Sequence, residues 1–262
     1  MRILITGAGG AIGAATTAVL TARHHEVVAT AREIDLLASV DAAQRLALDV
    51  KDTASIRAAL DQAGELDAIV NNAALTGRGP LEDYPIDRLR ELFDTNALGP
   101  LRLVQAVAPA WRERGSGVTV NVSSVQGRVS TPLDGSYAAT KYALEALSES
   151  MYYELSHFGI RTVIIEPGYT SPGMKSSPHH VGPSAYADLW DQWTGTDAKL
   201  TGPDGRPGPE LVAGAIADAI EDPTTPLRVP VGQDAELVLS TRRQLTDAEF
   251  ETAMRATLGL SW

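Results

Sequence analysis

The strongest constraint on the fold is a regular alternation between short apolar runs and segments with helical periodicity. The apolar runs are rich in Val, Ile and Leu, which is typical of strands that are buried on both faces. Strands of this kind, separated by helices, indicate a parallel sheet with helices on both faces. We expect strands at 2–6, 26–30, 45–49, 67–71, 118–122, 161–166 and 227–231, and helices near 12–23, 53–63, 86–113, 136–157 and 209–221.

The same order predicts a single α/β domain that spans residues 1–262, because neither an internal repeat nor a linker divides the chain. One segment, 169–208, breaks the alternation. It is rich in Pro, Gly and Ser but contains Tyr186, Trp190 and Trp193. We interpret this segment as a lid insertion over the substrate. The C-terminal end of the chain predicts one amphipathic helix.

Composition excludes several classes of partner. The formal net charge of −11 comes from 33 acidic and 22 basic residues, without a basic run, so we expect no nucleic-acid partner. No segment reaches the ~18 apolar residues of a membrane span, and the N-terminus lacks a signal-peptide pattern. We therefore expect a cytoplasmic protein without a membrane partner. The absence of cysteine, and of an HExxH pattern among the five histidines, predicts no metal centre.

The first predicted strand runs into a glycine-rich turn, TGAGGAIG at 6–13. Glycines permit a sharp turn and let backbone N–H groups, together with the dipole of the following helix, approach a pyrophosphate. An ordinary strand–helix turn is the alternative, but the position at the first such junction of a parallel sheet favours a dinucleotide site. The residues expected to bind it here are Gly7, Gly9, Gly10, Ala11, Ile12 and Gly13.

The end of the second predicted strand indicates which dinucleotide binds. An acidic residue there would hold the adenosine ribose hydroxyls, but the chain has Ala31 followed by Arg32. A guanidinium can bind a 2′-phosphate, with a net contribution of about 1.5–3 kcal/mol, so we predict NADP as the cofactor. A solvated surface arginine is the alternative. Asp49, which ends the third predicted strand, could accept from the adenine amino group or cap a helix, and Val50 is expected beside it.

Further motifs follow in a fixed order: NNAA at 71–74, TNALG around Asn96, NVSS at 121–124, YAATK at 137–141 and EPG at 166–168. With the glycine turn, they resemble the short-chain dehydrogenase/reductase family in its compact single-domain branch. The run YALEALSESMYYELSHFGI is similar to retinol- and hydroxysteroid-dehydrogenase-like members. The resemblance implies a doubly wound Rossmann fold with a seven-stranded parallel sheet, and assembly as a homodimer or homotetramer.

Tyr137 and Lys141 lie four residues apart, so they share one face of a helix. A cation at ~4 Å, in an effective dielectric of ~20, supplies the ~4 kcal/mol needed to bring a phenol pKa from about 10 to near neutrality. We expect Lys141 to lower the pKa of Tyr137, which would then act as the general acid–base of hydride transfer. The resemblance implies that Ser124 hydrogen-bonds the substrate oxygen and that Asn96 organises a water beside the lysine; a buried structural amide is the alternative for Asn96.

The resemblance also implies further residues at the cofactor, which besides Tyr137 and Lys141 are Asn72, Ala73, Ala74, Pro167, Gly168 and Thr170. At the substrate we expect Ser124 and Tyr137, together with Gln126, Leu133 and Asp134, which flank them in the sequence, and Trp190 of the predicted lid. Two positions depart from the compact branch, because Ala11 and Ala74 stand where it has glycine. The glycine spacing instead matches the family's longer branch, which includes sugar-nucleotide epimerases and dehydratases.

These features predict an NADP(H)-dependent enzyme that reduces a ketone to a secondary alcohol, or catalyses the reverse reaction. The partner would be a small hydrophobic or cyclic molecule. An epimerase or isomerase that uses the nicotinamide only transiently is one alternative. A nucleotide-sensing regulatory protein on the same fold is another, although such proteins typically lose the tyrosine–lysine pair.

Overall fold

The centre of the molecule is a seven-stranded sheet with strand order β3-β2-β1-β4-β5-β6-β7. The computed structural model describes residues 1–174, 185–198 and 205–261. All six strand pairings are parallel. The strands are β1 (Arg2–Ile5), β2 (Glu26–Ala31), β3 (Gln44–Ala47), β4 (Ala68–Asn71), β5 (Gly117–Val122), β6 (Ile160–Pro167) and β7 (Arg228–Val231).

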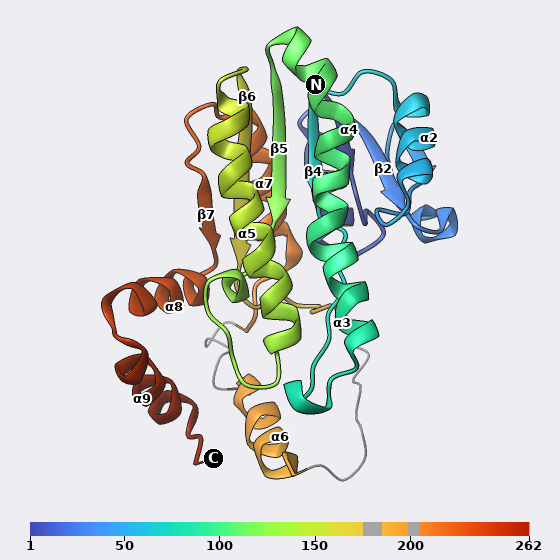
Figure 1. The fold of residues 1–262 in the computed structure, drawn as a ribbon. Coiled ribbons are helices and arrows are strands. Elements are labelled where there is room, and N and C mark those ends of the chain that lie inside the picture. Colours follow the sequence, from blue (N-terminus) through green and yellow to red (C-terminus); the bar gives the residue numbers. More distant parts are fainter. Residues whose placement is uncertain (175–184, 199–204, 262) are drawn as a thin grey trace.

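Helices cover both faces of this sheet, as Figure 1 shows with α4 and α5 in front and α7 behind. The helices are α1 (Ala11–Ala22), α2 (Thr53–Ala63), α3 (Ile86–Phe93), α4 (Gly99–Arg114), α5 (Gly135–Ser156), α6 (Ala187–Thr194), α7 (Pro209–Glu221), α8 (Gln233–Gln244) and α9 (Asp247–Leu258). The predicted doubly wound Rossmann fold is therefore confirmed.

Two apolar cores lie on either side of the sheet. Ile3 and Ile5 point into the core beneath α1 and α7, whereas Leu4 points into the core beneath α2, α4 and α5. Successive residues of a strand alternate between faces. Both faces are covered here, so both sets of residues must be apolar. This requirement explains the continuous apolar runs in the sequence.

The helix predicted at 86–113 forms, but it is not α-helical throughout. A π-helical turn, Asp94–Leu98, separates α3 from α4, and Pro100 lies in the first turn of α4. In an α-helix the carbonyl of Asn96 would accept from the N–H of residue 100, which proline lacks. The backbone widens instead, and Gly99 donates to the carbonyl of Asp94, five residues back. The break places Asn96 at a point where helices often carry functional groups.

The C-terminal end also differs from the prediction, because it forms two helices instead of one. Leu245 is extended between α8 and α9. Thr246 and Glu249 then form a reciprocal capping box that begins α9. The predicted lid at 169–208 contains α6 and a 3₁₀ turn, Gly195–Ala198, while its residues 175–184 and 199–204 lie outside the described part. Among the described helices, none has the length and apolar character needed to cross a bilayer.

Buried polar contacts fix α5 against the sheet. Asn71 donates to the side-chain oxygen of Asn121 at 2.8 Å, and Asn121 donates to the Ser148 hydroxyl at 2.8 Å. All three residues are buried. They join β4, β5 and α5 through side chains that have no access to water.

Asn121→Ala should therefore lower the free energy of unfolding by roughly 2–4 kcal/mol. The substitution leaves two buried groups, the Asn71 amide and the Ser148 hydroxyl, without this hydrogen-bond partner. Urea denaturation measures this loss. Ser150→Ala, which removes an exposed hydroxyl from the same helix, is the control and should change stability by less than about 0.5 kcal/mol. A loss below about 1 kcal/mol for Asn121→Ala would contradict the role given to this contact.

Candidate active site

The first two turns of α5 carry Tyr137 and Lys141, two residues of the predicted catalytic set, and a third, Ser124, lies beside them. Tyr137 is buried, and a hydrogen bond joins its phenol to the side chain of Ser124. Ser124 follows β5 and caps a 3₁₀ turn, where its hydroxyl accepts from the backbone N–H of Gln126 at 3.1 Å. The Lys141 ammonium lies 5.6 Å from the centre of the Tyr137 ring. These three side chains therefore meet at the carboxyl end of β5.

Lys141 is almost completely enclosed, with 3% of its surface exposed. Its ammonium donates to the carbonyl of Val122, the last residue of β5, at 2.8 Å. Burial lowers the pKa of Lys141 to about 8, although the Glu145 carboxylate one turn along α5 acts in the opposite direction. The ammonium is therefore mostly charged at neutral pH, close to the phenol.

The expectation that Lys141 lowers the pKa of Tyr137 is wrong for this structure. Burial raises the pKa of the phenol, the hydrogen bond with Ser124 offsets part of that rise, and the negative charge of Asp134 adds to it. The lysine points its ammonium at the strand carbonyl instead of the phenolic oxygen. Tyr137 consequently stays protonated near neutrality, which is the form that can donate a proton.

The side-chain amide of Asn96 makes three hydrogen bonds that fix this residue in place. The amide oxygen accepts from the N–H of Leu75 at 2.7 Å, and the amide nitrogen donates to the Leu75 carbonyl at 2.8 Å and to the Thr140 hydroxyl at 2.9 Å. The amide thus ties the segment after β4 to the turn of α5 that carries Lys141. Its backbone carbonyl, which has lost its α-helical donor at Pro100, is the group of this residue that can accept from a water or ligand.

The predicted glycine turn has the geometry of a close backbone approach. Gly7 has a φ of 65°, and a side chain at Gly13 would meet the Gly7 carbonyl at 2.4 Å. Gly10 begins α1 without a side-chain cap, and the first turn carries no acidic residue. The N–H groups of Ala11, Ile12 and Gly13 have no partner within the helix. These residues fit the pyrophosphate of a dinucleotide, because they offer free donors and the positive end of α1.

The NNAA motif holds this turn in shape. The Asn72 amide donates to the carbonyls of Thr6 and Gly7 at 3.0 and 3.1 Å, and the backbone of Asn72 and Ala73 donates to the Thr6 hydroxyl. Ala73 packs so closely on Gly7 that a side chain there would clash at 2.9 Å. Ala74 follows, half-buried, in the same segment.

The residues predicted at the adenosine end of the cofactor have different surroundings in the structure. Arg32 follows β2 with 59% of its side chain exposed, and its described acidic neighbour is Glu33 at 3.4 Å. The strand predicted at 45–49 ends at Ala47, and Asp49 accepts from the backbone N–H of Lys51 at 2.9 Å. Val50 is buried against Gly99 at the start of α4. Asp49 and Val50 therefore have local structural contacts, whereas Arg32 is free to turn toward a ligand.

Beside the end of β6, Asp234 is a site residue that the sequence prediction missed. Pro167 ends β6, and Gly168 donates to the Val231 carbonyl at 3.0 Å. The Asp234 carboxylate accepts from the N–H of Tyr169 at 2.6 Å and lies so close to Gly168 that a side chain there would clash. Thr170 follows, half-buried. An Asp in the first turn of a helix was a usable signal, but no helix was expected at that position.

A polar network lies in the loop between Ser124 and Tyr137. Asp134 is buried and accepts from Arg78 at 2.9 Å. Gln126 donates to Asp134 at 3.3 Å and to the Thr131 hydroxyl at 3.2 Å. The buried amide oxygen of Gln126 has no partner among the described residues. The network fixes the loop between Ser124 and Tyr137 and leaves an acceptor beside it.

An apolar cluster includes Leu133 of the same loop. Leu133, Leu189, Trp193, Leu258 and Leu260 are buried together. Tyr186, Trp190 and Met254 pack against them as partly buried neighbours. The structure therefore unites the loop before Tyr137 with α6 and α9. Trp190, predicted from the sequence, and Trp193 both belong to this wall.

A family model described as short chain dehydrogenase matches residues 1–180. The chain belongs to this family. Uncharacterized oxidoreductase YusZ of Bacillus subtilis is 31% identical over 97% of this chain and 97% of the relative. The 3-ketodihydrosphingosine reductase of Bacteroides thetaiotaomicron is 28% identical over 97% and 96%, and retinol dehydrogenase 8 of Bos taurus is 35% identical over 63% and 58%. The resemblance predicted from the motifs is confirmed.

Solved structures of the family have the same fold. A short-chain dehydrogenase from Streptomyces avermitilis has a TM-score of 0.83 and 33% identity, and the match covers 100% of this chain and 99% of that one. A gluconate 5-dehydrogenase from Burkholderia cenocepacia, in complex with NADP and tartrate, has a TM-score of 0.74 and 28% identity, covering 90% and 95%. A 3-oxoacyl-[acyl-carrier protein] reductase from Brucella melitensis with bound NAD has values of 0.73 and 26%, covering 87% and 88%. Members of this short-chain dehydrogenase family with this fold thus bind NAD or NADP.

The buried lysine of this short-chain dehydrogenase should be visible in the pH dependence of stability. The folded protein holds the Lys141 proton less tightly than the unfolded chain, with a pKa of about 8 against 10.5. The unfolded state therefore binds more protons between these values, so the free energy of unfolding should rise by roughly 2 kcal/mol from about pH 8 to about pH 10. Denaturant titrations at each pH measure the rise. Lys141→Met should lack it, and equal slopes in the two proteins would refute the assignment.

Proposed function

We propose that this protein is an NADP(H)-dependent oxidoreductase that reduces a ketone to a secondary alcohol, or catalyses the reverse. The observation that carries the proposal is the buried pair of Tyr137 and Lys141, with Ser124 hydrogen-bonded to the phenol. An intact acid, cation and hydroxyl at the carboxyl end of β5 form the set that such chemistry needs. A protein that only senses nucleotides has no need to bury an ammonium there.

Each side chain has a distinct task in this proposal. When bound, the nicotinamide cofactor supplies or accepts the hydride. Tyr137 donates its phenolic proton to the carbonyl oxygen in the reductive direction and accepts it in the oxidative one. Ser124 hydrogen-bonds the same oxygen and stabilises its developing charge. Lys141, fixed on the Val122 carbonyl, would bind the nicotinamide ribose, and Asn96 holds the α5 turn that carries the lysine.

The choice of NADP rests on the end of β2. Ala31 leaves no carboxylate to repel a 2′-phosphate, and the exposed Arg32 guanidinium can reach one. Glu33 competes for this guanidinium, but the ion pair is exposed and therefore weak. The NADP-bound relative from Burkholderia cenocepacia is consistent with this assignment, although NAD-bound relatives also exist.

The apolar wall beside Tyr137 supports a hydrophobic or cyclic substrate. Tyr186, Trp190 and Met254 pack against the buried cluster but keep part of their surface, which could contact a hydrocarbon group. Relatives named for a ketosphingoid base and for retinol support the same class. We also propose a homodimer or homotetramer, because α5 exposes 44% of Tyr142, 38% of Tyr152 and 65% of Tyr153.

Tyr137→Phe should abolish turnover while leaving NADPH binding nearly intact, because only the proton donor is removed. A positioned general acid contributes ~10²–10⁴-fold to the rate, so turnover should fall by at least about a hundredfold. Lys141→Ala should weaken both rate and cofactor binding. Ketone-dependent NADPH oxidation and NADPH fluorescence titration measure the two quantities. More than about a tenth of the rate in Tyr137→Phe would overturn the mechanism, and turnover without net cofactor oxidation would favour an isomerase.

The unaltered protein should prefer NADPH over NADH by at least about tenfold in kcat/KM, as expected for one phosphate–guanidinium contact. Arg32→Ala should lose most of that preference by weakening NADPH alone. Ala31→Asp combined with Arg32→Ala should invert it, because a carboxylate accepts from the ribose hydroxyls and repels the phosphate. Equal use of both cofactors by the unaltered protein would show that Arg32 is a solvated surface residue.

A further inference from the structure

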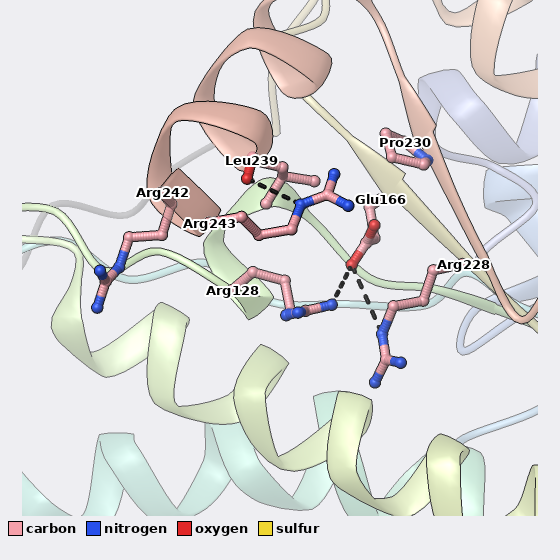
Figure 2. A pocket seen from close by; sticks show the side chains of 7 residues that line it. All are labelled: Arg128, Glu166, Arg228, Pro230, Leu239, Arg242 and Arg243. Atoms are coloured by element: carbon pink, nitrogen blue, oxygen red, sulfur yellow. Dashed lines mark hydrogen bonds and ion pairs between the residues drawn. The ribbon is translucent and has the colours of Figure 1, made fainter. Parts of the chain in front are cut away.

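A cavity of about 180 Å³ lies between β6, β7 and α8, apart from the site described above. Figure 2 shows its lining side chains, with Arg243 of α8 on one side of Glu166 and Arg128 and Arg228 on the other. The lining residues are Arg128, Glu166, Arg228, Pro230, Leu239, Arg242 and Arg243. Four of the seven are arginines, in a chain whose net charge is −11.

Two of these arginines are neutralised by neighbouring carboxylates. Arg228 donates to Glu145 at 2.9 Å and to Glu149 at 2.8 Å. Arg242 pairs with Asp247. Their positive charges are therefore largely compensated. These two arginines line the cavity but are already paired with carboxylates.

The other two arginines have weaker contacts with carboxylates, or none among the described residues. Arg128 is 3.5 Å from a carboxylate oxygen of Glu166, which also lies 3.9 Å from Arg228. Arg243 donates through its Nε to the carbonyl of Leu239 at 3.2 Å and has no acidic partner among the described residues. A guanidinium has five N–H donors, so both side chains keep several donors that the described chain does not use. These donors adjoin one cavity.

We propose that this cavity binds the phosphate-type dianion of a small organic ester. Two guanidinium groups from different elements, Arg128 after β5 and Arg243 on α8, can hold such a group from two sides. The volume of about 180 Å³ exceeds the need of one ion, since a water occupies about 30 Å³ in the liquid. Pro230 and Leu239 give the remaining space an apolar wall for a short carbon chain.

The cavity is distinct from the proposed position of the cofactor phosphates. Arg32 follows β2, and four strands lie between β2 and β7 in the sheet order. The glycine turn follows β1, which is also remote from the β7 edge. The dianion should therefore not compete with the cofactor phosphates for their binding site.

Glu166 should make the affinity depend on pH. It is buried, and burial together with the Glu145 charge raises its pKa to about 7. The charged groups around it are Glu145 and Glu149 on α5, Arg128, Arg228 on β7, and Arg242 and Arg243 on α8, with Asp247 paired to Arg242. A protonated Glu166 does not repel a bound anion, so affinity should be highest below about pH 7 and fall as the pH rises.

Calorimetric titration of the full-length protein with ethyl phosphate tests the proposal. We expect saturation with a Kd of about 1 mM or tighter, unchanged by saturating NADPH. Arg243→Gln and Arg128→Gln should each weaken binding at least about tenfold, the amount expected for one arginine–phosphate contact. Arg57→Gln removes an exposed charge from α2 and should leave the affinity unchanged.

Inorganic sulfate, whose charge is constant near neutrality, provides the pH test and separates a bare ion from an ester. Its affinity should fall about tenfold from about pH 6 to about pH 8, and Glu166→Gln should remove this dependence. Ethyl phosphate should bind more tightly than sulfate if the apolar wall is used. Three results would overturn the proposal. They are no saturation by either anion, an affinity in Arg243→Gln and Arg128→Gln equal to that of the unaltered protein, or a loss in Arg57→Gln as large as in these two variants. Thermal melting of each variant verifies that it is folded.

Discussion

Burial of the Lys141 ammonium is the constraint on which the site depends. Removing an ammonium from water costs several kcal/mol, and one strand carbonyl, that of Val122, receives its hydrogen bond. A helix under this penalty would gain by tilting so that the side chain could reach solvent. The buried contact of Asn121 with Ser148 opposes such a movement, because it ties the next turns of α5 to β5. The polar contacts along this helix therefore help to hold one charge in a buried position.

The sequence was sufficient for the sheet, the glycine turn and the grouping of Ser124, Tyr137 and Lys141, because each depends on local spacing. It was insufficient for the phenol pKa, because spacing sets a distance between side chains but not their burial or the direction of the ammonium. The break of the helix at 86–113 was readable from Pro100 but was obscured by continuous helical periodicity. Asp234 could not be assigned without knowing that α8 packs against the loop after β6.

The strand order distributes charge chemistry across the sheet. The free N–H groups of α1 follow β1, and the Arg32 side chain follows β2. The acid–base set lies at β5, and the arginine-lined cavity lies at the β7 edge. All three occupy the carboxyl ends of parallel strands, where helices begin and loops converge. An acidic chain can thus present cationic surface locally, because each arginine is positioned by a different strand or helix.

The apolar cluster around Leu133 has a different physical origin from the proposed acid–base set. Leu133 adopts a φ of 65°, a conformation that costs a branched residue about 1–3 kcal/mol. Its carbonyl accepts from Gly79 at 2.8 Å, and its side chain is buried with Trp193 and Leu258. The burial of apolar surface offsets the strain only while α6 and α9 are in place. The short spacing of Ser124 and Tyr137 therefore places the proposed acid–base set, whereas the apolar cluster depends on packing between segments far apart in the sequence.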